Sequence, residues 1–147
     1  MKFKPANDGV DHVNVYSQGK TQLGKLLSNF ADTPFEIEGK GKFKTVEGFW
    51  YWTMTGLEEL RDLPGWQCKE VGRRAETVRS HPNETELFEA YEAKLDSNPH
   101  IITMLLNNNL PLAHYYVYSG NIVEPKEWQW TALLWNKVAD KIRGYGK

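Results

Sequence analysis

One carboxylate stands where local structure would let it take part in chemistry. Glu47 comes two residues after Thr45, a favourable helix N-cap, at the start of an aromatic-rich run that predicts a helix over residues 46–55. The positive end of the helix dipole stabilises a carboxylate by ~0.3–1 kcal/mol, so we expect Glu47 to be ionised. An ionised carboxylate can stabilise an oxocarbenium-like centre or orient an attacking water when a glycosidic bond is cleaved. A glutamate with a purely structural role at the helix start is the alternative.

Side chains suited to a ribosyl ligand occur in the neighbouring segments. Asn29, beside Phe30, can bond sugar hydroxyls or simply cap a turn. Arg73 follows a glycine, and it can hold a phosphate or lie on a solvated helix face. Aromatic residues make up 13% of the chain, so some rings can stack on a flat ligand while most fill the core. His114, at the start of a predicted strand, can also face a site.

Other common chemistries lack support in the sequence. The four histidines show no spacing typical of a metal site, and the single cysteine, Cys68, can form neither a disulfide framework nor a cysteine-based zinc site. With no clear base partner, Cys68 is predicted to be a packed thiol. The chain has no P-loop, no GxGxxG fingerprint and no GxSxG elbow. We therefore expect no metal ion and no cofactor.

The charge balance limits the class of partner. The chain has 147 residues with 18 Lys and Arg against 19 Asp and Glu, so it lacks the basic excess of a dedicated duplex-DNA binder. A small anionic ligand needs only a few local donors and is compatible with this balance. No signal peptide, transmembrane run or disulfide framework is recognisable, so we expect a cytoplasmic protein without membrane contact.

The elements that must position these residues are predicted to form one α+β domain over residues 1–147, helix-rich and with a small β-sheet. Predicted strands are 12–16, 114–118 and a hairpin of 34–38 with 43–46, and a loop is predicted over 17–27. Predicted helices are 46–55, 57–63, 66–77, one after the Asn83 capping box, one from Pro99 to the 107–111 breaker, and one carrying an apolar stripe from Trp128 to Ile142.

An ordered set of short motifs resembles the NADAR family, whose name refers to NAD and ADP-ribose chemistry. The matching motifs are Val15-Tyr16-Ser17, Ser28-Asn29-Phe30, Pro34-Phe35, Thr45-Val46-Glu47 and Gly72-Arg73, and Glu92-Ala93-Lys94-Leu95 with Asn98-Pro99 is similar to a later family helix. Their order and spacing agree over residues 13–106, about two thirds of the chain. The resemblance implies a single α+β domain of NADAR type.

This resemblance implies hydrolysis of N-glycosidic bonds at a ribose. Known activities of the family include removal of ADP-ribose from modified guanine bases and breakdown of ribosylaminopyrimidine phosphates. The expected ligands are therefore ADP-ribose or a related riboside, or an ADP-ribosylated nucleic acid or protein. The resemblance makes Glu47 the catalytic carboxylate. The expected substrate contacts are Ser17 and Asn29 to the ribose, Arg73 to a phosphate and Phe30 or Trp50 to the base, with Tyr16 also in the site.

The chain departs from the family pattern at several pocket positions. The family His after the glutamate is Gly48, and the Gln and Lys further along that helix are Tyr51 and Met54. The family's later Trp and Asp-x-x-Trp-Gly stretch are not recognisable, and Trp128 and Trp130 are the candidate replacements. Divergence of this size would be natural in a viral member of the family, such as one from a bacteriophage.

Three functions are compatible with these observations. The first is an N-glycosidase in which Glu47 stabilises the transition state. The second is a non-catalytic module that binds a nucleotide or ADP-ribose, which the loss of the family His and Lys favours. The third is a protein–protein interaction domain, which the aromatic excess favours because exposed Trp and Tyr are typical of interfaces.

Overall fold

The computed structural model describes residues 3–144, and the chain divides into two compact units. The first unit comprises the chain up to Ser28 together with the chain from His100 onward, and the second runs from Asn29 to Pro99. Both units combine helices with short strands, which confirms the predicted α+β class. Within the described residues, no helix is long and apolar enough to cross a membrane.

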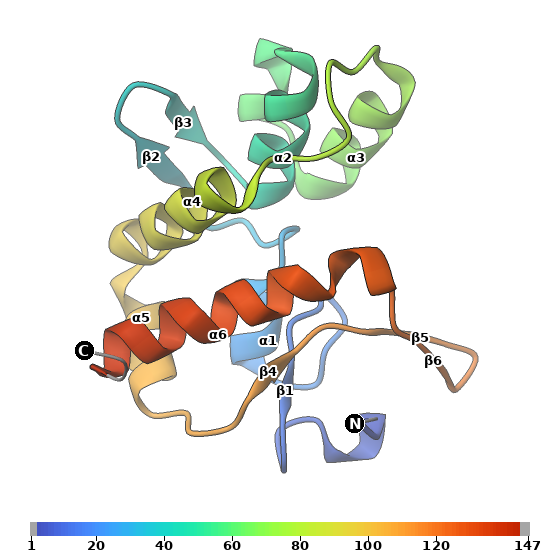
Figure 1. Ribbon diagram of the computed structural model, residues 1–147, viewed down its shortest axis with the longest axis vertical. Helices are drawn as coiled ribbons and strands as arrows, with labels where there is room; N and C mark the ends of the chain where they lie inside the picture. Colours follow the sequence, from blue (N-terminus) through green and yellow to red (C-terminus); the bar gives the residue numbers. More distant parts are fainter. Residues whose placement is uncertain (1–2, 145–147) are drawn as a thin grey trace. The chain divides into compact units, whose positions relative to one another are not determined.

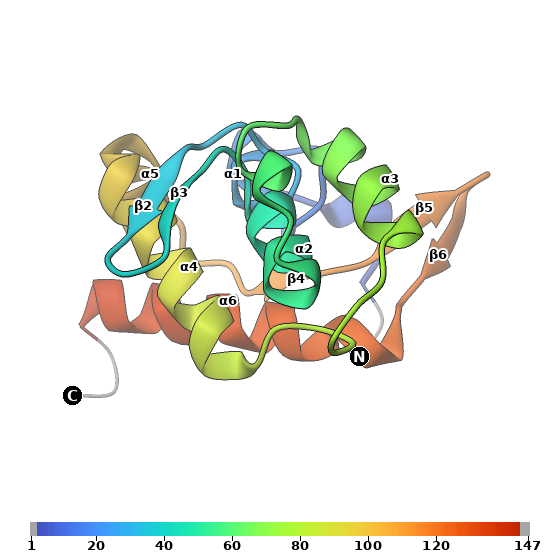
Figure 2. The ribbon, with the colours of Figure 1, turned by 90° about the horizontal axis from the view of Figure 1, so that it is seen from above.

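The second unit carries most residues of the candidate site. Its elements in chain order are β2 (Phe35–Ile37), β3 (Gly41–Phe43), α2 (Val46–Thr55), the 3-10 helix η2 (Glu58–Arg61), α3 (Gly65–Arg74) and α4 (Glu84–Ser97). Helices α2 and α3 lie side by side, and β2 lies against α4 (Figures 1 and 2). A hairpin forms where it was predicted and the predicted bounds of α2 are confirmed, but the second strand is 41–43 rather than 43–46, because Gly41 already pairs with Ile37 and Val46 begins α2.

Phenylalanines on the inward face of the β2–β3 hairpin hold it against α2. Phe35 pairs with Phe43 in antiparallel register, and their ring centroids are 5.8 Å apart. Both rings also pack against Phe49, with centroids at 6.4 and 5.2 Å. Gly41 has a φ of 96°, a left-handed conformation that suits glycine. The chain leaving β3 therefore enters α2 with its first turns fixed against the hairpin.

Caps set the bounds of α2. The Thr45 side chain accepts a hydrogen bond from the Gly48 amide at 2.9 Å, and Gly56 ends the helix with a φ of 76°. Beyond it, η2 covers only residues 58–61 of the predicted helix over 57–63.

Helix α3 ends at Arg74 rather than near residue 77. The Val78 amide donates to the Met54 carbonyl at 2.8 Å, so the chain after α3 runs back along α2 and cannot continue as helix.

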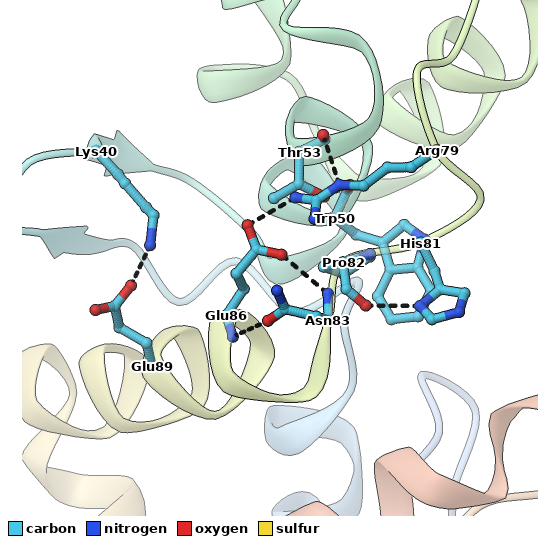
Figure 3. A network of polar contacts seen from close by, with 9 residues as sticks. All are labelled: Lys40, Trp50, Thr53, Arg79, His81, Pro82, Asn83, Glu86 and Glu89. Atoms are coloured by element: carbon cyan, nitrogen blue, oxygen red, sulfur yellow. Dashed lines mark hydrogen bonds and ion pairs between the residues drawn. The ribbon is translucent and has the colours of Figure 1, made fainter.

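Helix α4 begins with the predicted capping box. The Asn83 side chain accepts from the Glu86 amide at 2.8 Å, and the Glu86 carboxylate accepts from the Asn83 amide at 2.9 Å. Glu86 also accepts from Arg79 at 2.6 Å, and Arg79 donates to the Thr53 carbonyl at 3.2 Å (Figure 3). Arg79 therefore ties the C-terminal half of α2 to the start of α4.

The first unit is built from the two ends of the chain. Its elements are η1 (Pro5–Asn7), β1 (Val13–Asn14), α1 (Gln22–Leu27), α5 (Pro99–Leu106), β4 (Leu112–Ala113), β5 (Tyr116–Tyr118), β6 (Asn121–Val123), η3 (Lys126–Trp128) and α6 (Gln129–Arg143). Strands β1 and β4 pair in parallel, and β5 and β6 are antiparallel. The predicted apolar stripe of α6 is buried at Thr131, Leu134, Trp135 and Val138.

The predicted loop over residues 17–27 is wrong, because α1 forms there. Thr21 caps its first turn by accepting from the Gly24 amide at 2.9 Å. Gly24 does not break the helix. A Cβ at this position would lie 2.2 Å from the Asn14 carbonyl oxygen, so glycine is what lets α1 approach β1.

The predicted strand over residues 114–118 is only partly right. Strands β4 and β5 are separate, since the Asn14 side chain accepts from the Tyr115 amide at 3.0 Å and donates to its carbonyl at 2.9 Å. These bonds satisfy the backbone at Tyr115 outside any ladder. In place of one small sheet, the described residues form three two-stranded sheets.

Candidate functional site

One face of α2 carries the candidate catalytic residue and three large side chains. Glu47, Trp50, Tyr51 and Met54 recur at i, i+3, i+4 and i+7, so they lie on the same side of the helix. Glu47 is only 9% exposed, and Tyr51 is half-buried. The carboxyl of Glu47 is therefore held inside the protein, in contrast to most glutamates in a first helical turn.

Asn29 fixes Glu47 from two directions. The Glu47 amide donates to the Asn29 carbonyl at 2.9 Å, which satisfies one of the unpaired amides at the helix start. The Asn29 side chain also hydrogen-bonds the Glu47 carboxyl. The Asn29 amide, which the sequence analysis assigned to the ribose, therefore bonds the Glu47 carboxyl.

Helix α3 places two cations toward Glu47. Lys69 and Arg73 are four residues apart, hence on one face, and both interact electrostatically with the Glu47 carboxyl. The Lys69 ammonium lies 5.8 Å from the ring centroid of Phe30. Sequence reasoning identified Arg73 but missed Lys69, although its position one turn before Arg73 was the signal that could have found it.

The pKa of Glu47 is set by competing effects. Burial raises it from 4.5 to about 7, and the Lys69 charge, the Asn29 hydrogen bond and the Arg73 charge oppose that rise. The expected ionised carboxylate is therefore only one of two forms present near neutral pH, because loss of solvation outweighs both the helix N-terminus and the cations. A carboxyl with a pKa near neutrality can either accept or donate a proton at neutral pH.

Tyr51 joins the site through its hydroxyl. Burial raises the pKa of Tyr51, the Glu47 charge raises it further, and the charge of Arg73 and a hydrogen bond from it act in the opposite direction. Gly72 makes room for the ring, since a Cβ there would lie 2.1 Å from the ring atom Cδ1. The Gly72-Arg73 motif thus has two uses, a close helix contact and a cation beside Tyr51.

Gly48 stands at a position with no room for a side chain. A Cβ at residue 48 would lie 2.4 Å from the Leu60 carbonyl oxygen and 3.3 Å from the sulfur of Cys68. This position is filled by the backbone of η2 and by α3, and no larger side chain fits there. The Cys68 thiol is buried, with its sulfur 3.4 Å from the Leu60 carbonyl oxygen and 3.3 Å from that of Leu63, so the predicted packed thiol is confirmed.

The other predicted substrate residues lie in different environments. Trp50 is only 8% exposed and its ring lies 6.4 Å from that of His81 (Figure 3). Tyr16 and Ser17 belong to the first unit. Tyr16 packs edge-on against Tyr116 at 5.4 Å, and Ser17 is exposed.

The remaining candidates also belong to the first unit. His114 is half-buried, and its Nδ1 lies 2.8 Å from the Val15 carbonyl oxygen. Trp128 ends η3 and Trp130 lies in the first turn of α6, both half-buried.

An open hollow of about 690 Å³ lies elsewhere in the second unit, over the β2–β3 hairpin. Its charged lining residues are Asp32, Glu36, Lys42, Lys44, Arg61 and Asp62. Acidic and basic side chains are mixed there. Arg61 donates a hydrogen bond to Glu58 at 2.9 Å, and its guanidinium lies 4.5 Å from the centroid of the Phe43 ring. Glu47 does not line this hollow.

Over residues 3–144, no group of three or more His, Cys, Asp or Glu side chains is arranged to hold a metal ion. Comparisons of the chain with protein-family models, with curated proteins and with solved structures gave no match.

Proposed function

We propose that this chain is a NADAR-like N-glycosidase that hydrolyses the bond between a base and a phosphorylated ribose in an ADP-ribose-type or related substrate. The observation that carries the proposal is the buried Glu47 carboxyl, hydrogen-bonded by Asn29 and flanked by Lys69 and Arg73. A titratable carboxyl beside two cations suits a substrate that is negatively charged and reacts through a positively charged centre.

In this reaction the bond between C1 of the ribose and the base nitrogen breaks, and its electron pair stays on the nitrogen. Positive charge develops at C1, where the ionised form of Glu47 stabilises it. Water adds its oxygen to C1 and gives a proton to Glu47, which passes a proton on to the departing nitrogen. A pKa of about 7 suits both transfers, because the carboxyl can take up and release a proton at neutral pH.

The surrounding residues bind the substrate and orient the side chains of the site. In this proposal Lys69 and Arg73 hold a phosphate, which their positive charges beside Glu47 support. Asn29 keeps the Glu47 carboxyl in place through its hydrogen bond. Tyr51 is a positioning residue that orients Arg73 through their hydrogen bond.

The test is product analysis with Glu47→Gln, which removes the ionisable group while keeping the size of the side chain. Substrates would include ADP-ribosylated guanine oligonucleotides and ribosylaminopyrimidine phosphates, with released ADP-ribose or released pyrimidine base measured by mass spectrometry. We expect turnover by the natural chain and its loss in Glu47→Gln, with retained folding by circular dichroism. Glu70→Gln, an exposed residue beside Lys69, is the matched control and should retain turnover. A turnover rate in Glu47→Gln equal to that of the natural chain would contradict the proposal.

A non-catalytic binding module is the second candidate, and the packing at Gly48 favours it. The family His cannot fit where a Cβ would meet the Leu60 carbonyl oxygen at 2.4 Å, so any step that depends on that His is lost. This candidate predicts that ADP-ribose binds through Lys69 and Arg73 and is recovered unchanged after long incubation with every substrate of the panel.

A further inference from the structure

Trp66 is an exposed indole in the first turn of α3, the helix that carries Lys69 and Arg73. It is 56% exposed, whereas Trp50, which with Phe30 was one of the two residues predicted to contact the base, is only 8% exposed. An indole so accessible can offer a ring face to a ligand, and a tryptophan enclosed by its own protein cannot.

Trp66 lies on the same face of α3 as the two cations. Trp66, Lys69 and Arg73 recur at i, i+3 and i+7, and this face spans about 10 Å along the helix axis. It therefore combines a flat apolar ring with two positive charges, the pair of features that binds a base and its phosphate.

Phe30 joins this face to Glu47. A Cβ at Gly65 would lie 2.8 Å from the Phe30 Cα, so the start of α3 rests directly on Phe30. The Lys69 ammonium stands 5.8 Å from the Phe30 ring centroid, and Asn29, the preceding residue, bonds the Glu47 carboxyl. Phe30, Lys69 and Asn29 are thus linked to Glu47 within one unit, and Trp66 directly follows Gly65, the residue that packs on Phe30.

We propose that Trp66 is the platform on which the base of an anionic nucleotide stacks, with Lys69 and Arg73 holding its phosphate. This inference rests on the proposed function, because it assigns the base of that same substrate to a residue. It moves the base contact from Phe30 or Trp50 to Trp66 and makes the ligand class a nucleotide rather than a sugar phosphate without a base.

The test compares two ligands that differ only in the base. AMP and ribose 5-phosphate would be titrated calorimetrically into Glu47→Gln protein, which keeps the ligands intact. We expect Trp66→Ala in this background to weaken AMP binding about fivefold or more and to leave ribose 5-phosphate binding unchanged. Trp66→Phe should retain most of the AMP affinity, and Lys69→Ala should weaken both ligands. Leu133→Ala, at a 64% exposed apolar residue of α6, is the control and should change neither.

The assignment of Trp66 would be overturned if Trp66→Ala weakened the binding of both ligands equally or left AMP binding unchanged. It would also be overturned if the Glu47→Gln protein did not bind AMP. A change in self-association with unaltered AMP affinity would also overturn it, and would make Trp66 part of a protein interface. If Trp66→Ala weakens AMP binding alone and the natural chain hydrolyses none of the substrates, Trp66 keeps its role as the platform for the base. Only the proposed catalysis would then be contradicted.

Discussion

At the scale of single residues, the account depends on how Glu47 is held. The helix N-terminus, Lys69, Arg73 and Asn29 all favour the ionised carboxylate, while burial favours the protonated acid, and burial dominates. The cations then decide how far above 4.5 the pKa lies. Their removal should therefore change the pH dependence of catalysis in a direction that can be stated in advance.

Lys69→Ala should move the pH profile of hydrolysis upward. If Glu47 acts in its ionised form, the rate rises with pH through about 7, the pKa of the carboxyl, and then levels off. Removing the Lys69 charge raises that pKa, so the midpoint of kcat/KM should shift to higher pH. Lys25→Ala, an exposed lysine of the other unit, is the control. An unchanged midpoint in Lys69→Ala would contradict the electrostatic role of Lys69.

Gly48→Ala should destabilise the protein. In an uncrowded helix this substitution stabilises by up to about 1 kcal/mol, because alanine is the better helix former. Here the new methyl group would meet the Leu60 carbonyl oxygen at 2.4 Å, so we expect a net loss of about 1–3 kcal/mol. Urea unfolding would measure the change in the free energy of unfolding. A variant more stable than the natural chain would show that there is room for a methyl group at position 48.

At the scale of elements, the site depends on how α2 and α3 are held together. The segment between α3 and α4 is attached to α2 by the Val78 amide and by Arg79, which also bonds Glu86 (Figure 3). This attachment covers the C-terminal half of α2 while the N-terminal half carries Glu47. The two ends of α2 are therefore supported by different contacts.

Arg79→Ala should loosen this segment and leave the capping box of α4 in place. We expect faster hydrogen exchange at the Val78 amide and a stability loss of about 1–3 kcal/mol, because the variant removes two hydrogen bonds from a charged donor. Arg74→Ala, at an exposed residue, is the matched control. Unaltered exchange at Val78 would show that Arg79 does not hold the segment.

The sequence predicted elements well wherever local signals set their ends. Helix α2 has a Thr45 cap and a terminal Gly56, and α4 has the Asn83 capping box, so each start or end is fixed by its own residues. Helix α1 was missed because Gly24 is also typical of loops, and its actual reason, close approach to the Asn14 carbonyl, is a tertiary contact. Asn29, Glu47 and Arg73 were found by type and order, whereas the burial that raises the Glu47 pKa depends on packing.

At the scale of the whole molecule, a second buried ionisable group affects stability. Lys94 of α4 is fully buried, and burial lowers its pKa from 10.5 to about 7. Between these two pH values the unfolded chain binds a proton that the folded chain has released. The free energy of unfolding should therefore rise with pH across this window, by at most about 1.4 kcal/mol per pH unit.

Lys94→Met should flatten that rise. The variant has no amine to titrate, so its free energy of unfolding, measured by urea titration between pH 7 and 10, should depend less on pH than that of the natural chain. Lys25→Met serves as the control because Lys25 is exposed. Parallel curves for Lys94→Met and the natural chain would mean that Lys94 keeps an ordinary pKa in the folded protein.

Calorimetric titration with ADP-ribose asks whether the Glu47 site takes an anionic ribosyl ligand. We predict binding by the natural chain, retained binding in Glu47→Gln, and clear weakening in Arg73→Ala. Absence of detectable heat up to millimolar ADP-ribose, or equal affinity in the natural chain and Arg73→Ala, would contradict the claim.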